Sequence, residues 1–233
     1  MSKIVVLGAG ISGHTAAAHL RRKLSKEHEV LVVSPNRNYQ WVPSNIWVGI
    51  GRMKSKEVIF PLEPLYKRKG IGYKQAKAVS FHPEGDSSEA KPYILVEGVF
   101  GDNLGKQEKV TYDYLINATG PKLAFDMTEG LQPATNKVYA VCTYDHAEHA
   151  SEALHKLIDQ LKKSDKKSKI LIGTGHAKAT CQGAAFEYIL NVEKELQKFG
   201  VRDKAEITWI SNEYELGDFG MDGMLMEYNG FNM

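Results

Sequence analysis

The sequence contains few cysteines, no large excess of positive or negative charge, and no long apolar run. Two cysteines among 233 residues exclude a disulfide scaffold. The formal net charge of +2 gives no reason to expect a nucleic acid or an anionic membrane as partner. No apolar run approaches the ~18 residues of a membrane span, and we expect no secretory leader or signal peptide. The 42% hydrophobic and 25% charged residues are ordinary for a globular protein of one large or two small domains.

A glycine motif opens the chain. Ile4–Leu7 is a run of apolar, mostly β-branched residues, which is typical of a buried parallel strand. Gly8, Gly10 and Gly13 follow with the G-x-G-x-x-G spacing of a dinucleotide-binding turn. The first glycine permits the tight bend, the second lets a pyrophosphate approach the backbone, and the third lets the helix pack against the strand. The motif therefore predicts nucleotide binding.

The residues after the motif complete a βαβ unit. His14–Leu24 contains three consecutive alanines and predicts a helix whose N-terminal N–H groups favour phosphates. Glu29–Ser34 predicts the second strand. The Asp or Glu that usually binds the ribose at the end of this strand is missing, and Ser34-Pro35-Asn36 stands there instead. Ser34 or Asn36 is then the candidate for the ribose hydroxyls, and the identity of the dinucleotide stays open.

The middle of the chain changes pattern. Asn38–Trp47 is dense in aromatic residues and is predicted to be a loop, either walling a planar ring or packing on its own domain. Three later stretches are strand-like and predict a small antiparallel meander inserted into the first domain: Gly70–Val79, Tyr93–Val99 and Lys109–Ala118. Polar turns at Asp86–Glu89 and Gly101–Asn103 separate them, and the last strand ends at Thr119-Gly120-Pro121.

The second half repeats the opening. Ser151–Lys163 predicts an amphipathic helix, and the lysine-rich run Lys162–Lys169 is interpreted as a solvated loop. The repeat itself comprises a strand and turn, a helix and another strand: Lys169–Gly175, Gly183–Phe199 and Glu206–Ser211. We therefore expect an α/β fold with two dinucleotide-binding, Rossmann-like domains of the glutathione-reductase type, at residues 1–135 and 136–233. A second doubly wound domain needs ~100 residues. Because the tail from Glu215 shows no clear period, we expect an incomplete second domain and a longer parent protein.

The second turn departs from the first. Lys178 stands where the third glycine belongs, and no acidic residue ends the strand Ile207–Ser211. The sequence therefore predicts no tight pyrophosphate site at this turn.

Cys181 stands where the second turn enters its helix. A thiol at a helix N-terminus feels the positive end of the dipole, which favours the thiolate, and Lys178 and His176 act in the same direction. A free cysteine is more often a small buried apolar residue. Its position here favours a reactive thiol.

Cys142 follows a predicted short strand, Lys137–Val141. His146 and His149 are close enough in sequence to move protons if the segment lines a cavity, although an exposed helix start remains the alternative for both. A Cys/His/His metal site is conceivable, but the spacing matches no strong pattern, and we expect no metal.

With these motifs assembled, the chain resembles the N-terminal half of a sulfide:quinone oxidoreductase, within the flavoprotein disulfide reductase superfamily. The resemblance extends essentially from end to end. It is carried by the opening glycines and by four further stretches: Val42–Gly49, Ala118–Phe125, Cys142–Ala147, and Ala179–Cys181 with Gly183 and Glu187.

The resemblance implies FAD as cofactor and sulfide and a membrane quinone as substrates. Sulfide would attack a sulfur bridge between Cys181 and a third cysteine, electrons would enter the flavin, and sulfur would leave as polysulfide. The third cysteine, most of the quinone pocket and a membrane-docking segment would lie in the rest of a peripheral membrane protein whose membrane side is unknown. The sequence leaves a homo-oligomer open and indicates no nucleic acid. The chain alone should not turn over quinone.

The same resemblance assigns site residues. Cys181, Cys142, His146 and Glu187 would be catalytic. Those near FAD would be Gly8, Ala9, Gly10, Ile11, Ser12, Gly13, Ser34, Pro35, Val42, Pro43, Ala78, Thr119 and Gly120.

Three other functions were weighed. An NADH:quinone oxidoreductase has the same plan but needs an intact second turn. A sulfide dehydrogenase flavoprotein would carry an export leader and a cysteine near Val42 for covalent flavin, and neither is present. A non-catalytic FAD-binding fragment is the remaining alternative.

Overall fold

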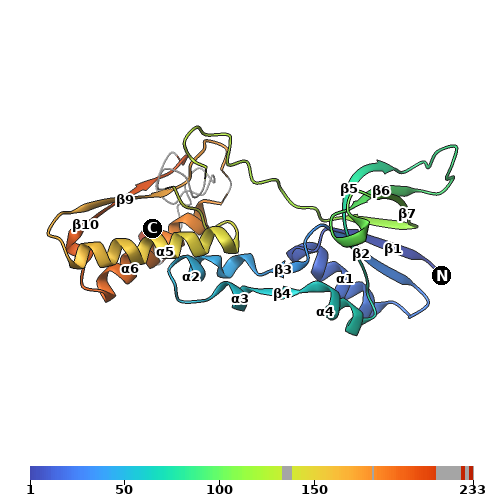
Figure 1. Cartoon of the computed structure of the whole chain (residues 1–233), viewed down its shortest axis with the longest axis horizontal. Coiled ribbons are helices and arrows are strands. Elements are labelled where there is room, and N and C mark those ends of the chain that lie inside the picture. The colour runs from blue at the N-terminus through green and yellow to red at the C-terminus, as the bar shows by residue number, and fades with distance from the viewer. Residues whose placement is uncertain (133–137, 180, 214–226, 229–230, 233) are drawn as a thin grey trace. The chain divides into compact units, whose positions relative to one another are not determined.

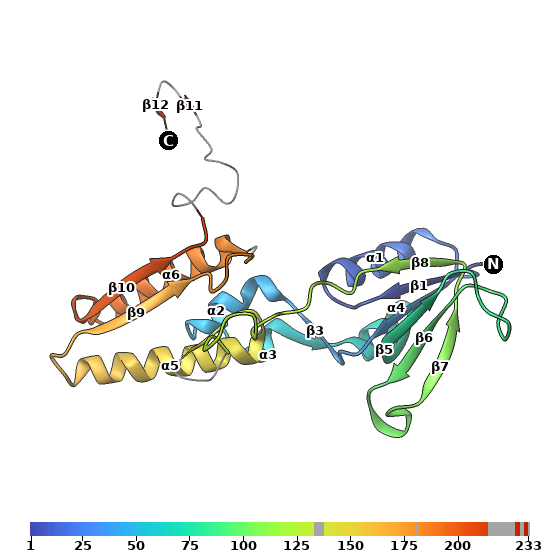
Figure 2. The ribbon, with the colours of Figure 1, turned by 90° about the horizontal axis from the view of Figure 1, so that it is seen from above.

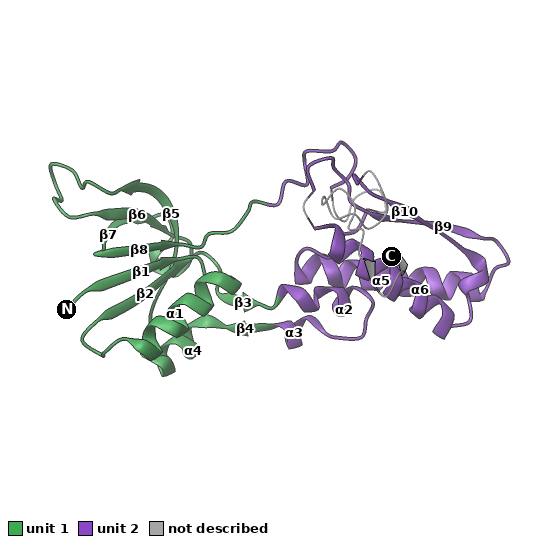
Figure 3. Ribbon diagram, turned by 180° about the vertical axis from the view of Figure 1, so that it is seen from behind, with its two compact units in different colours: residues 1–41, 59–122 green, residues 42–58, 123–233 purple. Residues whose placement is uncertain are grey.

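The computed structural model describes residues 1–132, 138–179, 181–213, 227–228 and 231–232. Within them the chain forms two compact units (Figure 3). Unit 1 comprises residues 1–41 and 59–122, and unit 2 comprises residues 42–58 and 123–233. Val42–Val58 thus groups with the second half of the chain, whereas the predicted domain boundary at residue 135 stays a prediction.

Unit 1 is built on a six-stranded sheet with the order β7-β6-β5-β2-β1-β8 (Figure 1). Strands β8, β1, β2 and the first part of β5 are parallel, and β5, β6 and β7 form an antiparallel meander. The elements are β1 (Lys3–Leu7), α1 (Ile11–Lys23), β2 (Glu29–Ser34), β3 (Asn38–Gln40), β4 (Ile59–Pro61), α4 (Leu62–Lys69), β5 (Gly72–His82), β6 (Tyr93–Gly98), β7 (Gln107–Thr111) and β8 (Tyr114–Asn117), with a 3-10 turn at Gly101–Asn103. The predicted α/β class and the opening βαβ unit are confirmed.

Alternation along the strands divides the core of unit 1 into two layers. Successive side chains of a strand point to opposite faces of the sheet. Val6 therefore packs with α1 and α4 residues such as Ala17 and Leu62 on one face. Val5 and Leu7 pack with meander residues such as Ile94 and Val96 on the other. Figure 2 shows α1 on one side and the curled meander strands on the other.

The predicted polar turn at Asp86 connects β5 to β6 and is held by one carboxylate. Asp86 Oδ1 accepts hydrogen bonds from the backbone N–H groups of Ser88 and Glu89, at 2.8 and 2.9 Å. Its Oδ2 accepts one from the Tyr93 hydroxyl at 2.5 Å and pairs with the Lys109 ammonium at 2.9 Å. Hydrogen bonds from Tyr93, Lys109 and Ser88 hold the pKa of Asp86 well below its usual range.

We expect Asp86→Asn to loosen this turn at neutral pH. Because folding depresses the pKa of the carboxyl group, its stabilising contribution is complete above the unfolded pKa of about 3.9 and is lost as pH falls toward the folded pKa. Amide hydrogen exchange at Ser88 and Glu89 should therefore accelerate in the variant at pH 7. Glu84→Gln, an exposed carboxylate two residues earlier, is the control. Equal exchange in Asp86→Asn and wild type would contradict the assignment.

Unit 2 contains the second βαβ unit. Its elements are a 3-10 turn at Val42–Ser44, α2 (Asn45–Gly49), α3 (Ser55–Val58), α5 (Tyr144–Lys162), β9 (Ser168–Gly173), α6 (Gln182–Lys198), a 3-10 turn at Arg202–Lys204, β10 (Ala205–Ile210), β11 (Glu227–Tyr228) and β12 (Phe231–Asn232). β9 and β10 are parallel, as the internal repeat predicts. Among the described residues no helix is long and apolar enough to span a bilayer.

The core of unit 2 lies between its helices and the β9–β10 pair. Leu154, Ile158 and Leu161 of α5 pack with Val192 and Leu196 of α6. The Glu195 carboxylate is buried within α6, and the Arg52 guanidinium pairs with it at 2.5 Å. This ion pair holds the segment that follows α2 against α6.

Three predictions of local structure need correction. The predicted loop Asn38–Trp47 contains β3, a 3-10 turn and the start of α2, because pairing with β4 and packing on α5 supply contacts that no local pattern shows. The predicted strand Lys137–Val141 is wrong for Val138–Val141, which belong to no strand, and Lys137 lies outside the described residues. The helix predicted from Ser151 begins seven residues earlier, at Tyr144.

Candidate functional site

The first glycine turn is packed so tightly that two of its glycines are required. Gly8 has φ +91°, and a Cβ there would lie 2.2 Å from the carbonyl oxygen of Ala118. A Cβ at Gly13 would lie 2.0 Å from the carbonyl oxygen of Gly8. The Gly8 N–H donates to the Val33 carbonyl at 2.8 Å. The turn is thus clamped between the ends of β2 and β8.

Gly10, in contrast, faces open space. A Cβ at this position would have no neighbouring atom within 4 Å, and Gly10, Ile11 and Ser12 are exposed. Gly10 is the N-cap of α1, whose first turn contains no acidic residue. Because the first N–H groups of a helix lack intrahelical acceptors and carry the positive end of the dipole, this opening fits an anionic group such as a pyrophosphate.

The other predicted residues of unit 1 lie mostly at the same edge of the sheet. Ser34 ends β2, where its buried hydroxyl accepts a hydrogen bond from the Asn36 N–H at 3.2 Å. Thr119 follows β8, and its hydroxyl donates to the Asn117 side chain at 2.8 Å. Gly120 has φ +71° with open space around it. The register pairs Leu7 with both Val33 and Asn117, so these strand ends are level.

Three further predicted residues surround this edge. Ala9 is buried beneath the turn, and Pro35 is exposed just beyond the end of β2. Ala78 lies on β5, three residues beyond Gln75, which pairs with Ser34. The structure therefore gathers the unit 1 part of the predicted site along one edge of the sheet.

The second turn is filled by protein. A Cβ at Gly175 would lie 2.6 Å from Leu131 Cδ1, and the Thr128 hydroxyl donates to the Gly175 carbonyl at 2.8 Å. A Cβ at Gly173 would lie 1.7 Å from the Ile210 carbonyl oxygen. This turn lacks the open face of Gly10, which agrees with the degraded motif.

Asn212 is a residue that the sequence reasoning missed. It follows β10, at the position where only an acidic residue was sought. Its side-chain nitrogen donates to the carbonyls of Ala177 and Ala179, at 2.9 and 3.2 Å, and its oxygen accepts from Thr174 and Gln182. Asn212 therefore ties the second turn to the start of α6, and both the nitrogen and the oxygen of its side chain are engaged.

Both thiols are free and belong to unit 2. Cys181 is the exposed N-cap of α6, as predicted, and Cys142 lies two residues before α5. Surrounding protein atoms raise the pKa of Cys142, and the charge of Cys181 raises it further. The two sulfurs therefore lie near enough within unit 2 for the charge of one to act on the other.

His146 and Glu187 differ in their surroundings. His146 lies in the first turn of α5, where its ring meets Phe125 edge to face at a centroid distance of 5.1 Å. Its buried Nδ1 has no hydrogen-bond partner among the described residues. Glu187 is exposed on α6, in the second turn after Cys181.

Tyr188 connects the segment before Cys142 to α2 and α6. Its hydroxyl donates to the Gly49 carbonyl at 3.1 Å, and burial raises its pKa. A Cβ at Gly49 would lie 2.8 Å from Val141 Cγ1 and 3.0 Å from the Tyr188 ring. Sequence spacing could not predict that Gly49 and Tyr188 are in contact. Both residues nevertheless lie in or next to the stretches that carry the resemblance.

Val42 and Pro43 form part of a 3-10 turn in unit 2 and are exposed. Their relation to the glycine turn, and the catalytic and binding roles of all the predicted site residues, stay predictions. The described residues contain no group of three or more potential metal ligands.

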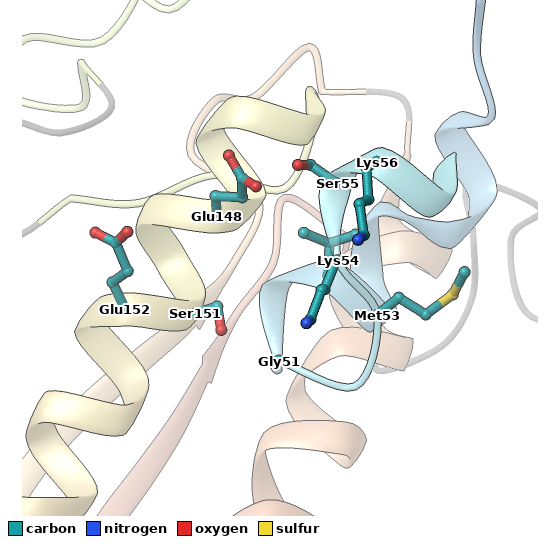
Figure 4. A pocket seen from close by; sticks show the side chains of 9 residues that line it. Gly51, Met53, Lys54, Ser55, Lys56, Glu148, Ser151 and Glu152 are labelled. Atoms are coloured by element: carbon teal, nitrogen blue, oxygen red, sulfur yellow. The ribbon is translucent and has the colours of Figure 1, made fainter. Parts of the chain in front are cut away.

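Unit 2 also contains a hollow of about 460 Å³, which is lined by other residues (Figure 4). Glu148, Ser151 and Glu152 of α5 form one wall, and Lys54 and Lys56 contribute to the other. None of the predicted site residues lines this hollow.

Comparison with known proteins identifies relatives of the whole chain. The model of the pyridine nucleotide-disulphide oxidoreductase family matches residues 2–186. A sulfide-quinone reductase from Aquifex aeolicus is 29% identical over 221 residues, which cover 95% of this chain and 45% of that protein. The crystal structure of the Aquifex aeolicus sulfide:quinone oxidoreductase superposes with a TM-score of 0.74 at 27% identity, covering 96% of this chain and 46% of that one.

A third relative has a different activity. An external alternative NAD(P)H-ubiquinone oxidoreductase, B4, from Arabidopsis thaliana mitochondria is 32% identical over 132 residues, covering 56% of this chain and 21% of that protein. The chain spans less than half the length of each of these relatives. Because the family model covers most of the sequence, the chain belongs to the pyridine nucleotide-disulphide oxidoreductase family.

Proposed function

We propose that this chain binds FAD and carries redox-active thiols for the oxidation of sulfide, with electrons passed on to a membrane quinone. The observation that carries the proposal is the exposed Cys181 at the N-cap position of the helix of the second βαβ unit, with the thiol of Cys142 near enough for the charges of the two sulfurs to interact. The Aquifex aeolicus relatives, which match over 95% and 96% of the chain, support sulfide and quinone as substrates. They also support a peripheral membrane protein as the setting.

Unit 1 would hold the dinucleotide. The open face at Gly10 and the N–H groups of Ile11 and Ser12 would receive the pyrophosphate. Ser34 and Pro35 would lie beside the ribose, and the backbone near Ala78 beside the adenine. Gly8 and Gly13 keep the turn closed against the sheet, and Ala9 packs beneath it.

The remaining predicted residues would border the rest of the dinucleotide. Thr119 and Gly120 follow β8 at the edge where the glycine turn lies, and Gly120 has open space for a ligand. In this proposal residues 1–135 form the domain that holds FAD, and residues 136–233 form the domain that carries the thiols.

The thiols would handle sulfur. Conversion of HS⁻ to zero-valent sulfur releases two electrons and a proton, and FAD, when bound, supplies the two-electron acceptor. Cys181, exposed at the helix N-terminus, would retain the sulfur atom, and Cys142, whose pKa is raised, would take the less direct part. His146, with its unpartnered buried Nδ1, and Glu187 would move the proton.

An NADH:quinone oxidoreductase is the second candidate, because the Arabidopsis thaliana relative is 32% identical over about half of the chain. The filled second turn argues against it. Leu131 occupies the space at Gly175 where a nicotinamide dinucleotide would need the backbone to be open. A non-catalytic FAD-binding module is the third alternative.

Addition of sulfide to the FAD-loaded full-length parent protein under anaerobic conditions should bleach the flavin absorbance, and Cys181→Ala should abolish this bleaching while FAD stays bound. The reason is that the alanine removes the thiol that would retain the substrate sulfur but leaves unit 1 unchanged. Cys142→Ala is the matched control and should slow the reaction rather than stop it. Normal bleaching in Cys181→Ala would overturn the role of this thiol. Bleaching by NADH, but not by sulfide, would replace the proposal with its second candidate.

A further inference from the structure

A hollow of about 480 Å³ lies beside α1 in unit 1. Basic and imidazole side chains dominate its lining, none of its lining residues is acidic, and none belongs to the Gly8–Gly13 turn. The polar side chains that line it are His14, Thr15, His19, Arg21, Arg22 and Lys69. We call this hollow the α1 pocket.

Two helix ends concentrate positive charge next to the α1 pocket. The last turn of α1 contains Arg21, Arg22 and Lys23, and the last turn of α4 contains Lys67, Arg68 and Lys69. A Cβ at Gly70, the C-cap of α4, would lie 4.0 Å from Arg21 Cδ, so the two ends are neighbours. These six cations exceed the net charge of +2 of the whole chain. Cations offset the negative end of a helix dipole, but that effect alone does not account for a hollow lined by donors from both α1 and the last turn of α4.

The contacts of the lining residues show which cations are used to hold the fold and which could bind a ligand. Arg21 is committed to the fold, because its guanidinium donates to the carbonyls of His28 and Leu24 at 2.7 and 3.0 Å, and also to that of Ser25. Arg22 contacts the His19 ring at 3.3 Å through one nitrogen, which leaves its other N–H groups. Within the described part of the chain, Lys69 has no ion pair.

His14 contributes a neutral donor. Its Nδ1 lies 3.1 Å from the Tyr66 hydroxyl. Burial lowers the pKa of His14 and the charge of Lys69 lowers it further, whereas burial raises the pKa of Tyr66. The Tyr66 hydroxyl has no other hydrogen-bond partner among the described residues, so we assign it as the donor to Nδ1. The ring proton is then on Nε2, which remains as a donor to a ligand.

We propose that the α1 pocket binds a phosphate group. Arg22 and Lys69 supply charge, and His14 and Thr15 supply neutral donors, a combination that matches the acceptor-only oxygens of a phosphate. The phosphate belongs either to a small phosphorylated molecule or to a lipid headgroup, which share this chemistry. The pocket is separate from the dinucleotide turn, so the proposal does not depend on the function proposed above.

The test uses the full chain and a pair of matched double variants. Arg22→Gln with Lys69→Gln removes two charges from the lining of the pocket. Lys23→Gln with Arg68→Gln removes two charges from the same helix turns outside the lining. Inorganic phosphate is titrated against each protein while the backbone amide signals of Thr15 and Lys69 are followed by NMR. In parallel, each protein is sedimented with phosphatidylcholine vesicles, with and without phosphatidic acid.

In the wild type, phosphate should shift the Thr15 and Lys69 signals saturably. The lining variant loses two charge-assisted contacts, each of which contributes about tenfold, so it should bind about a hundredfold more weakly. The control variant should bind like the wild type. Sedimentation with phosphatidic acid vesicles, lost only in the lining variant, would support the same site and identify a lipid headgroup as its source. Equal weakening in both double variants, shifts confined to the Gly10 turn, or no response to either probe would overturn the proposal.

Discussion

Replacing Gly10 by glutamate should leave unit 1 folded and strip FAD from the purified protein. The fold should tolerate the change, to within about 0.5 kcal/mol, because no atom lies within 4 Å of a Cβ at this position. Its φ of −72° suits any residue, and a carboxylate at a helix N-terminus is favourable. The same carboxylate would occupy the space proposed for the pyrophosphate and repel its charge.

Flavin content per mole of purified protein is the measurement, combined with thermal unfolding. Gly10→Gln separates bulk from charge, and we expect it to weaken FAD retention less than Gly10→Glu does. A purified Gly10→Glu protein with full flavin absorbance would show that the pyrophosphate lies elsewhere. Loss of both FAD and the folded state would instead contradict the open space at Gly10.

Gly13→Ala should have the opposite profile and destabilise unit 1 by about 3 kcal/mol. On helix propensity alone the change should stabilise α1 by about 1 kcal/mol. The structure reverses this sign, because the added Cβ would lie 2.0 Å from the carbonyl oxygen of Gly8, which belongs to the backbone of a clamped turn. Relief of the clash would require α1 to move away from the sheet.

Denaturant unfolding of the full chain measures this effect. Gly10→Ala, three residues earlier in the same motif, is the matched control and should change the free energy of unfolding by less than about 0.5 kcal/mol. An unfolding midpoint in Gly13→Ala equal to that of wild type would mean that the helix adjusts without cost. A Cβ would then cost equally little stability at Gly10 and at Gly13, which would contradict the short distance to the Gly8 carbonyl oxygen.

Elements with a continuous local signal were predicted closely. Glu29–Ser34 is predicted and observed with the same ends, because four apolar residues in succession occur where a strand is covered on both faces. The helix predicted from Ser151 begins instead at Tyr144, where the buried stripe is carried by Ala147 and Ala150. Alanine gives a weak apolar signal, and neighbouring histidines and glutamates obscured it.

Elements held only by distant contacts were missed. Asn38–Gln40 becomes a strand because Ile59–Pro61, about twenty residues further along the chain, pairs with it. The five-residue helix Asn45–Gly49 is too short to be stable alone. It is held by packing on α5 and by the Tyr188 hydroxyl, which donates to its last carbonyl. The hydrophobic periodicity of a short segment cannot show contacts with residues that are distant in the sequence.

The sequence by itself determined where the two βαβ units begin, which turn keeps all three glycines, and which cysteine caps a helix. These features depend on residue type and spacing within a few turns of chain. Only the tertiary structure decided that Gly10 stays open while Leu131 fills the corresponding space at Gly175. The physical reason is that the space beside a turn is set by whichever side chain packs there, and that side chain comes from a segment more than forty residues away.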